Sequence, residues 1–221
     1  MPRRKVRVDM QTSDLIKQLS TQVTPVRQSY SRRFLLAWMT GTAASLLLLV
    51  LTIGVRGDLG EAVYTWPFWM KWLYTIGLGV VGMMLSLYFA RPDNRSARGL
   101  WWLLVPVALL SLLAVHELQD APPEAVHRIW MGHSALMCPW NIFGISIPAF
   151  IAVMWMMRKL APTQLRLAGF AAGCLAGASG ATVYALLCNE STAPFVVAWY
   201  SLGMLLPGLL GALLGPKVLR W

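Results

Sequence analysis

Six long runs of apolar residues alternate with short polar segments along the chain. Each run has about the 20 residues that a helix needs to cross a bilayer, and none shows the strict alternation of a strand. A bilayer offers no water to backbone N–H and C=O groups, so such runs form helices. The sequence therefore predicts an all-α polytopic integral membrane protein with a six-helix transmembrane bundle. The predicted spans are Phe34–Val55, Phe68–Ala90, Leu100–Leu118, Leu136–Met157, Leu165–Cys188 and Pro194–Leu214.

The segment before the first apolar run is mostly polar. A secretory signal has a short basic region directly before its apolar stretch, whereas here a long polar segment precedes a run of full spanning length. We therefore predict two regions. Residues 1–33 form a retained cytoplasmic N-terminal tail, and residues 34–221 form the six-span transmembrane domain.

Positive charge is distributed unevenly between the two sides of the predicted bundle. Of the 19 lysines and arginines, all except Arg56, Lys71 and Arg128 fall in the tail, in the second and fourth loops or near the C-terminus. The positive-inside rule places that side in the cytoplasm, so both termini are expected there. The formal net charge of +10 is then mainly a topology signal. We expect no direct binding of nucleic acid, because that would need a folded basic domain.

The spans offer little chemistry for transport. No Asp, Glu, Lys, Arg or His falls in the middle of a span, whereas ion-coupled transporters usually carry such a residue on their pathway. The fifth span carries Gly169, Gly173 and Gly177 at a spacing of four. Such a stripe lets a neighbouring helix approach closely, and the fourth span is one candidate for that neighbour.

Two of the three cysteines are expected to lie at the same level. Cys138 opens the fourth span and Cys188 closes the fifth, so the topology places both at the outer surface. The two spans form an antiparallel hairpin, and at about 1.5 Å per residue both thiols end at nearly equal height. Outside a bacterial inner membrane the compartment is oxidising, which favours a disulfide or a redox switch. The alternative is that they are small packing residues, as we expect for Cys174, about 21 Å deeper than Cys188.

Metal binding is a further hypothesis for the same region. A soft metal site could be built from His133, Cys138 and Cys188, although an exposed histidine in an acidic loop needs no metal. No Cys-x-x-Cys, phosphate loop, nucleophile elbow or His-Glu-x-x-His motif is present. We therefore expect neither a cofactor nor a conventional enzyme active site.

The tail contains one short amphipathic pattern. At 100° per residue, Leu15, Ile16, Leu19 and Val23 share one face of a helix, and Asp14 suits its positive N-terminal end. So short a helix is marginal alone and needs a surface on which to bury its apolar stripe. Two interpretations remain open, a helix lying on the membrane and a docking peptide for a cytoplasmic protein.

Short motifs along the whole chain follow one another in the order found in one family. The motifs are Thr12–Ile16 with Leu19 and Pro25-Val26, Trp66–Lys71, Ala90–Pro92, Gly132–Ser134 with Cys138, Leu160–Thr163, Tyr184–Glu190, Phe195, Trp199-Tyr200 and Leu219–Trp221. With these motifs the chain resembles the NrsF-type negative regulators of extracytoplasmic-function sigma factors.

The resemblance implies a multi-pass anti-sigma factor of the bacterial inner membrane. The segment that holds the sigma factor maps onto Thr12–Val26. The two outward cysteines that the family needs for release under metal or oxidative stress map onto Cys138 and Cys188. The rival hypotheses are a membrane thiol–disulfide oxidoreductase and a small transporter or channel.

Overall fold

The computed structural model describes residues 12, 17, 30–54, 56–91 and 96–220. Every regular element in these residues is a helix, and six helical segments are long and apolar enough to cross a membrane. The predicted all-α architecture of six long helices is confirmed. The long segments are α2 (Tyr30–Thr52), α4 (Trp66–Phe89), η1 (Ala97–Leu103) continued by α5 (Leu104–Gln119), α7 (Cys138–Lys159), α8 (Leu165–Tyr184), and α9 (Ala193–Phe195) continued by η2 (Val196–Tyr200) and α10 (Ser201–Val218).

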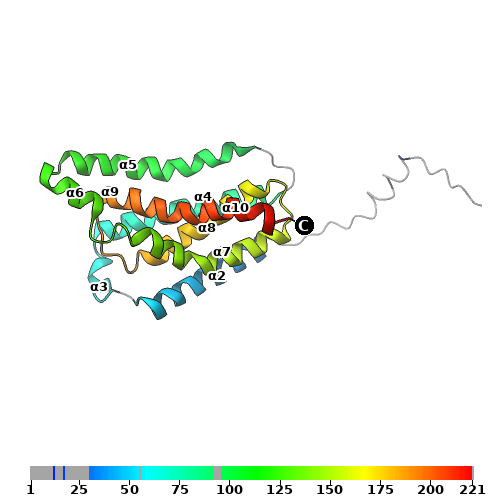
Figure 1. The fold of residues 1–221 in the computed structure, drawn as a ribbon, viewed down its shortest axis with the longest axis horizontal. Helices are drawn as coiled ribbons and strands as arrows, with labels where there is room; N and C mark the ends of the chain where they lie inside the picture. Colours follow the sequence, from blue (N-terminus) through cyan, green and yellow to red (C-terminus); the bar gives the residue numbers. More distant parts are fainter. Residues whose placement is uncertain (1–11, 13–16, 18–29, 55, 92–95, 221) are drawn as a thin grey trace, which may run out of the picture.

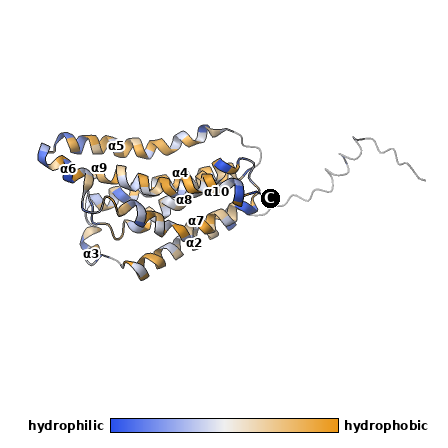
Figure 2. Ribbon diagram, in the orientation of Figure 1, coloured by the Kyte–Doolittle hydropathy of each residue, from blue (hydrophilic) through white to orange (hydrophobic). Residues whose placement is uncertain are grey.

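The long segments lie side by side along the long axis of the molecule, so the bundle has two ends (Figure 1). The short helices α3 (Leu59–Ala62) and α6 (Pro123–Met131) lie at one of them, the α3/α6 end. Hydrophobic residues run along the lengths of the long helices, and hydrophilic residues gather towards the two ends (Figure 2).

The opposite end, the basic end, holds the start of α2 and the C-terminal ends of α4, α7 and α10. Most of the described basic residues lie at this end and are exposed. The unequal charge seen in the sequence is therefore also a separation in space. The residues are Arg32, Arg33, Arg91, Arg98, Arg158, Lys159, Arg166, Lys217 and Arg220.

Helix α8 is the centre of the bundle. In its most apolar 18-residue stretch 78% of the residues are buried, against 11% for the η1–α5 segment at the periphery. It consists largely of Gly and Ala and contacts α2, α4, α7 and α10. Between apolar helices surrounded by lipid, small residues stabilise packing because they let the backbones approach closely.

The glycine stripe of α8 packs against α10 and not against α7, the fourth span, which was one candidate for its neighbour. A side chain at Gly169 or Gly173 would overlap the backbone carbonyl of Gly211 or Pro207 in α10. Gly180, in contrast, meets α7. The stripe fits α10 because that helix presents glycines of its own at facing positions.

Helix α8 also ends earlier than predicted, at Tyr184. The backbone N–H groups of Leu186 and Leu187 donate to the carbonyls of Val183 and Tyr184, at 3.2 and 2.9 Å. Bonds between residues three apart tighten the last turn and end the helix. Cys188 consequently lies in the connection between α8 and α9 and not at the end of a span.

Candidate functional site

The side chains of Cys138 and Cys188 meet at the α3/α6 end. Cys138 is the first residue of α7, and its thiol is a close neighbour of the Cys188 thiol. Both are free thiols, with exposed fractions of 0% and 4%. Their place on the outer side of the membrane stays a prediction, but neither thiol is exposed at the protein surface. The two sulfurs come together, but they are buried because α9 and η2 pack around them in one apolar cluster.

Tyr200 lies beside the pair and is fully buried. It ends the π-helical turn η2, a rare backbone form that occurs often at functional sites. Its hydroxyl has no conventional hydrogen-bond partner among the described residues, but it interacts with the Cys188 sulfur. The Tyr200 ring lies 6.0 Å from the ring of Tyr184. The thiol pair is thus surrounded by the aromatic side chains of Tyr184 and Tyr200, and the Tyr200 hydroxyl is a polar neighbour.

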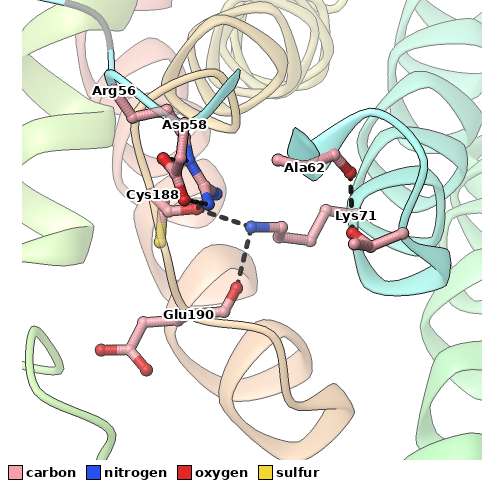
Figure 3. Close-up of polar contacts among 7 residues, drawn as sticks. Arg56, Asp58, Ala62, Lys71, Cys188 and Glu190 are labelled. Atoms are coloured by element: carbon pink, nitrogen blue, oxygen red, sulfur yellow. Dashed lines mark hydrogen bonds and ion pairs between the residues drawn. The ribbon is translucent and has the colours of Figure 1, made fainter. Parts of the chain in front are cut away.

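Lys71 holds the segment that carries Cys188. This side chain of α4 is 1% exposed, and its Nζ donates to the carbonyl oxygens of Cys188 at 2.7 Å and Glu190 at 2.8 Å. Figure 3 shows the ammonium group between these two carbonyls. A buried ammonium needs such acceptors, because its desolvation is otherwise unfavourable. The two bonds fix the α8–α9 connection against α4.

A second cation approaches the same carbonyl. Arg56 Nη1 lies 3.5 Å from the Cys188 oxygen, and its Nη2 forms an ion pair with Asp58 at 2.5 Å (Figure 3). The neighbouring Cys138 thiol lowers the pKa of the Cys188 thiol, with smaller contributions from the Tyr200 hydroxyl and the charge of Lys71. Burial acts in the opposite direction.

Glu190 connects this segment to the turn before α7. Its Oε1 accepts hydrogen bonds from the His133 backbone N–H at 2.6 Å and from Ser134 Oγ at 3.3 Å. Gly132 makes the approach possible, since its φ is +50° and a Cβ there would overlap the Glu190 carboxylate. The carboxylate therefore ties the chain that carries Cys188 to the chain that leads into Cys138.

The predicted metal ligands do not all come together. The His133 side chain is fully exposed and its Nδ1 lies 3.8 Å from Glu190, whereas both thiols are buried. Within the described residues no group of three or more His, Cys, Asp or Glu side chains is placed to hold a metal ion. Cys174 is far from the pair in the fold, and it lines an apolar cavity of about 650 Å³ with residues of η1, α5 and α10.

The predicted partner-binding residues Asp14, Leu15, Ile16, Leu19 and Val23 lie outside the described residues. The sequence reasoning also missed three residues that build the site: Lys71, Tyr200 and Glu190. In the charge pattern of the sequence Lys71 is only one of three basic residues on the outer side. Lys71 lies four residues after Pro67, inside a predicted span. This position could have indicated its role, since a lysine within a span needs a polar or charged partner.

Comparisons with known proteins assign the chain to a family. It is 39% identical to a probable anti-sigma-F factor NrsF of Azospira oryzae, over 96% of this chain and 100% of that protein. It is 34% identical to the anti-sigma-F factor NrsF of Caulobacter vibrioides, over the same shares. No solved structure matches the chain. Residues 19–221 match the family model described as negative regulator of sigma F, and the chain belongs to this regulatory NrsF family.

Proposed function

We propose that this protein is an anti-sigma factor of the bacterial inner membrane. It holds an extracytoplasmic-function sigma factor inactive through the tail residues Asp14, Leu15, Ile16, Leu19 and Val23. It releases that factor when Cys138 and Cys188 are oxidised or bind metal. Support comes from two relatives that match this chain almost end to end and carry the name anti-sigma-F factor.

One observation carries the sensing part of the proposal. Two thiols, one at the start of α7 and one in the α8–α9 connection, lie close together at the α3/α6 end, and the tail leads into α2 at the basic end. With the basic end in the cytoplasm, as the positive-inside rule favours, the thiols face the oxidising side and the tail faces the sigma factor. Both termini are then cytoplasmic.

Formation of the disulfide can release enough free energy to drive such a switch. To move a two-state equilibrium from 1:99 to 99:1 takes about 5.5 kcal/mol. For a dithiol–disulfide couple, about 30 mV of potential difference corresponds to roughly 1.4 kcal/mol. A difference of roughly 120 mV between the pair and its oxidant therefore meets the requirement. Closing the bond pulls α7 and the α8–α9 connection into one covalent unit.

Single cysteine variants test the proposal. With a reporter of the regulated promoter, Cys138→Ser and Cys188→Ser should each abolish induction by oxidant or metal while basal repression survives. Cys174→Ser is the matched control and should induce normally. The thiol-switch function is refuted if the Cys188→Ser protein, present at normal level in the membrane, still induces fully.

Purification of the full-length protein from its own host separates the rival functions. The anti-sigma hypothesis predicts a co-purified sigma factor that dissociates on oxidation. A bound quinone that exchanges electrons with the thiols would instead indicate an oxidoreductase. Transport of an ion or solute by the protein in liposomes would indicate a transporter or channel.

A further inference from the structure

The apolar cavity that Cys174 lines is far from the thiol pair, on the side of the bundle where η1 and α5 lie. It has a volume of about 650 Å³ and is enclosed by η1 and α5 on one side and by α8 and α10 on the other. Its lining is almost entirely hydrophobic and includes Leu100, Val107, Phe170 and Met204. Small-molecule sites in proteins typically have volumes of about 300–1,000 Å³, so this cavity has the size of a ligand site.

The cavity exists because α5 leans on α4 and α9 and not on α8 and α10. Helix α5 lies at the edge of the bundle (Figure 1). A Cβ on Gly77 of α4 would lie 3.7 Å from the Pro106 ring of α5, so these two helices are in contact. Near the far end of α5, the Glu117 carboxylate accepts a hydrogen bond of 2.7 Å from the Ala193 backbone N–H of α9. These contacts hold α5 in place and leave a space between it and α8 and α10.

The cavity extends from the basic end to about the middle of the bundle. Its lining begins at Ala97, the first residue of η1, and reaches Val107 in α5. With a rise of about 2.0 Å per residue in η1 and about 1.5 Å in α5, this stretch is roughly 20 Å long. The hydrocarbon of one bilayer leaflet is about 15 Å thick. The cavity therefore has the length of an acyl chain in the leaflet at the basic end.

The inner part of the cavity offers little to a polar molecule. Ser201 contributes a hydroxyl to the lining, but that hydroxyl is already bonded to the Val197 carbonyl and to the Tyr74 hydroxyl. Cys174 contributes a thiol, which is a weak donor. A polar group buried without a partner is unfavourable. An occupant must therefore be apolar in this part, as an acyl chain is.

An exposed arginine lies one turn beyond each wall of the cavity, towards the basic end. In η1, Arg98 precedes the lining residue Trp101 by three positions, and residues three apart share a face of such a helix. In α8, Arg166 precedes the lining residue Phe170 by four positions, which also places both on one face. Within the described residues neither arginine forms an ion pair. Positive charge without a protein counter-charge thus flanks the basic end of the cavity.

We infer that this cavity binds an anionic phospholipid from the leaflet that contains the basic end. One acyl chain lies between α5 and the helices α8 and α10, and Arg98 and Arg166 attract the negative headgroup. Basic residues at a membrane surface bind anionic lipids in this way. Trp101 and Trp102 are 71% and 66% exposed beside the same end of the cavity, and tryptophan is enriched where hydrocarbon meets headgroups. The site is separate from the thiols and does not depend on the proposed function.

Photo-cross-linking of the full-length protein tests the inference. The purified protein is reconstituted in phosphatidylcholine vesicles with a small amount of phosphatidylglycerol that carries a diazirine at the end of one acyl chain. A phosphatidylcholine with the same photoreactive chain is the matched neutral probe. Cross-linked residues are mapped by mass spectrometry, and the yield at Phe170, Cys174 and Met204 is compared with that at Leu47, which is 59% exposed on α2.

The wild type should be cross-linked by phosphatidylglycerol mainly at the cavity residues. Each basic residue near an anionic lipid contributes about fivefold to binding, so the cavity yield should exceed that of the neutral probe by up to roughly thirtyfold. Arg98→Gln with Arg166→Gln should bring this ratio close to one. Arg158→Gln with Lys159→Gln is the matched control and should keep the wild-type ratio. It removes two exposed charges from the same end of the bundle, on α7, which does not contribute to the lining.

A second pair of variants tests the cavity itself. Val107→Trp places a large side chain in the cavity and should remove most cavity cross-links with both probes. Val105→Trp changes a residue of the same helix that is 46% exposed and outside the lining, and it should behave as the wild type. The arginine pair keeps the test decisive even if Val107→Trp does not fold, because Arg98 and Arg166 are exposed.

Four results would overturn the inference. The wild-type yield could be no higher at the cavity than at Leu47, which would mean contact with bulk lipid only. The two probes could label the cavity equally, or the ratio could survive the loss of Arg98 and Arg166, and either result would exclude recognition of an anionic headgroup. A folded Val107→Trp protein with unchanged cavity cross-links would show that the acyl chain lies elsewhere.

Discussion

The Glu190 carboxylate accepts a hydrogen bond of 2.6 Å from the backbone N–H of His133 and so joins two connections that are distant in sequence. One connection carries Cys188 and the other leads into Cys138. Lys71 anchors the first of them to α4 through two more bonds. The Glu190 carboxylate and the Lys71 ammonium group therefore hold together the two chain segments that carry the thiols.

Glu190→Ala should slow closure of the disulfide. The substitution removes the hydrogen bonds that the carboxylate accepts from His133 and Ser134. A hydrogen bond to a charged group typically stabilises a structure by about 1.5–3 kcal/mol. We therefore expect the rate of disulfide formation to fall roughly tenfold. Glu190→Gln keeps an acceptor oxygen and should have a smaller effect. The measurement is the rate of disulfide formation under a fixed oxidant, followed by gel shift.

The control for this prediction is Glu124→Ala, an exposed carboxylate in the first turn of α6. It should close its disulfide at the wild-type rate. If Glu190→Ala also closes at that rate, the carboxylate does not hold the two connections together.

The number and type of the long helices follow from the sequence because length and apolarity alone decide them. The contact of Cys138 with Cys188 was expected from the helix rise, but the burial of both sulfurs was not. Burial depends on how the α8–α9 connection and the first turns of the sixth long segment, α9 and η2, pack together at this end of the bundle, and no local pattern encodes that. The helix that packs on the Gly173 stripe also could not be predicted, since a stripe predicts close approach but not which helix approaches.

Gly173→Leu should destabilise the bundle more than any comparable change at its surface. A side chain there would overlap the Pro207 carbonyl of α10, which a rigid backbone cannot avoid. Overpacking typically costs about 1–3 kcal/mol. Thermal unfolding in detergent measures the loss. Gly144→Ala is the matched control in α7, because nothing lies within 4 Å of the added Cβ; equal melting temperatures would contradict the packing found here.

Polar replacement of the tail stripe should turn on the regulated promoter without any stress. In a protein with Leu15→Ser, Ile16→Ser and Leu19→Ser the apolar face that we propose for the sigma factor is lost. Constitutive expression, with normal protein level in the membrane, is the expected result. Gln18→Ala and Thr21→Ala, off that stripe, should repress normally. Continued repression by the triple variant would favour a helix that lies on the membrane.

Reporter fusions should place both ends of the chain in the cytoplasm. Fusions at Asn94 and after Trp221 should behave as cytoplasmic, and a fusion at Asp120 should behave as external. The physical reason is the excess of arginine and lysine at the basic end. An external C-terminus would put the thiol pair on the wrong side for the proposed switch.

The contact between α2 and α7 should carry the signal from the thiols to the tail. Gly41 of α2 packs directly on the backbone of Ala149 and Pro148 in α7, so that even a Cβ would lie 2.8 Å from the Ala149 Cα. Helix α7 begins at Cys138, and α2 is the helix that continues the tail. A displacement of α7 that follows disulfide closure therefore has a rigid route to the tail.

Gly41→Val should uncouple sensing from release. The added side chain separates α2 from α7 near the middle of the bundle and leaves the site at the α3/α6 end intact. Substitutions along a coupling route change the coupling by about 0.5–2 kcal/mol, so induction by oxidant should fall between about twofold and thirtyfold. Disulfide formation, measured in the same cells by thiol trapping, should be unchanged. Leu47→Ala, on the exposed face of the same helix, is the control. Normal induction in Gly41→Val would show that the signal reaches the tail by another path, such as the bond from Trp38 to Ser179 of α8.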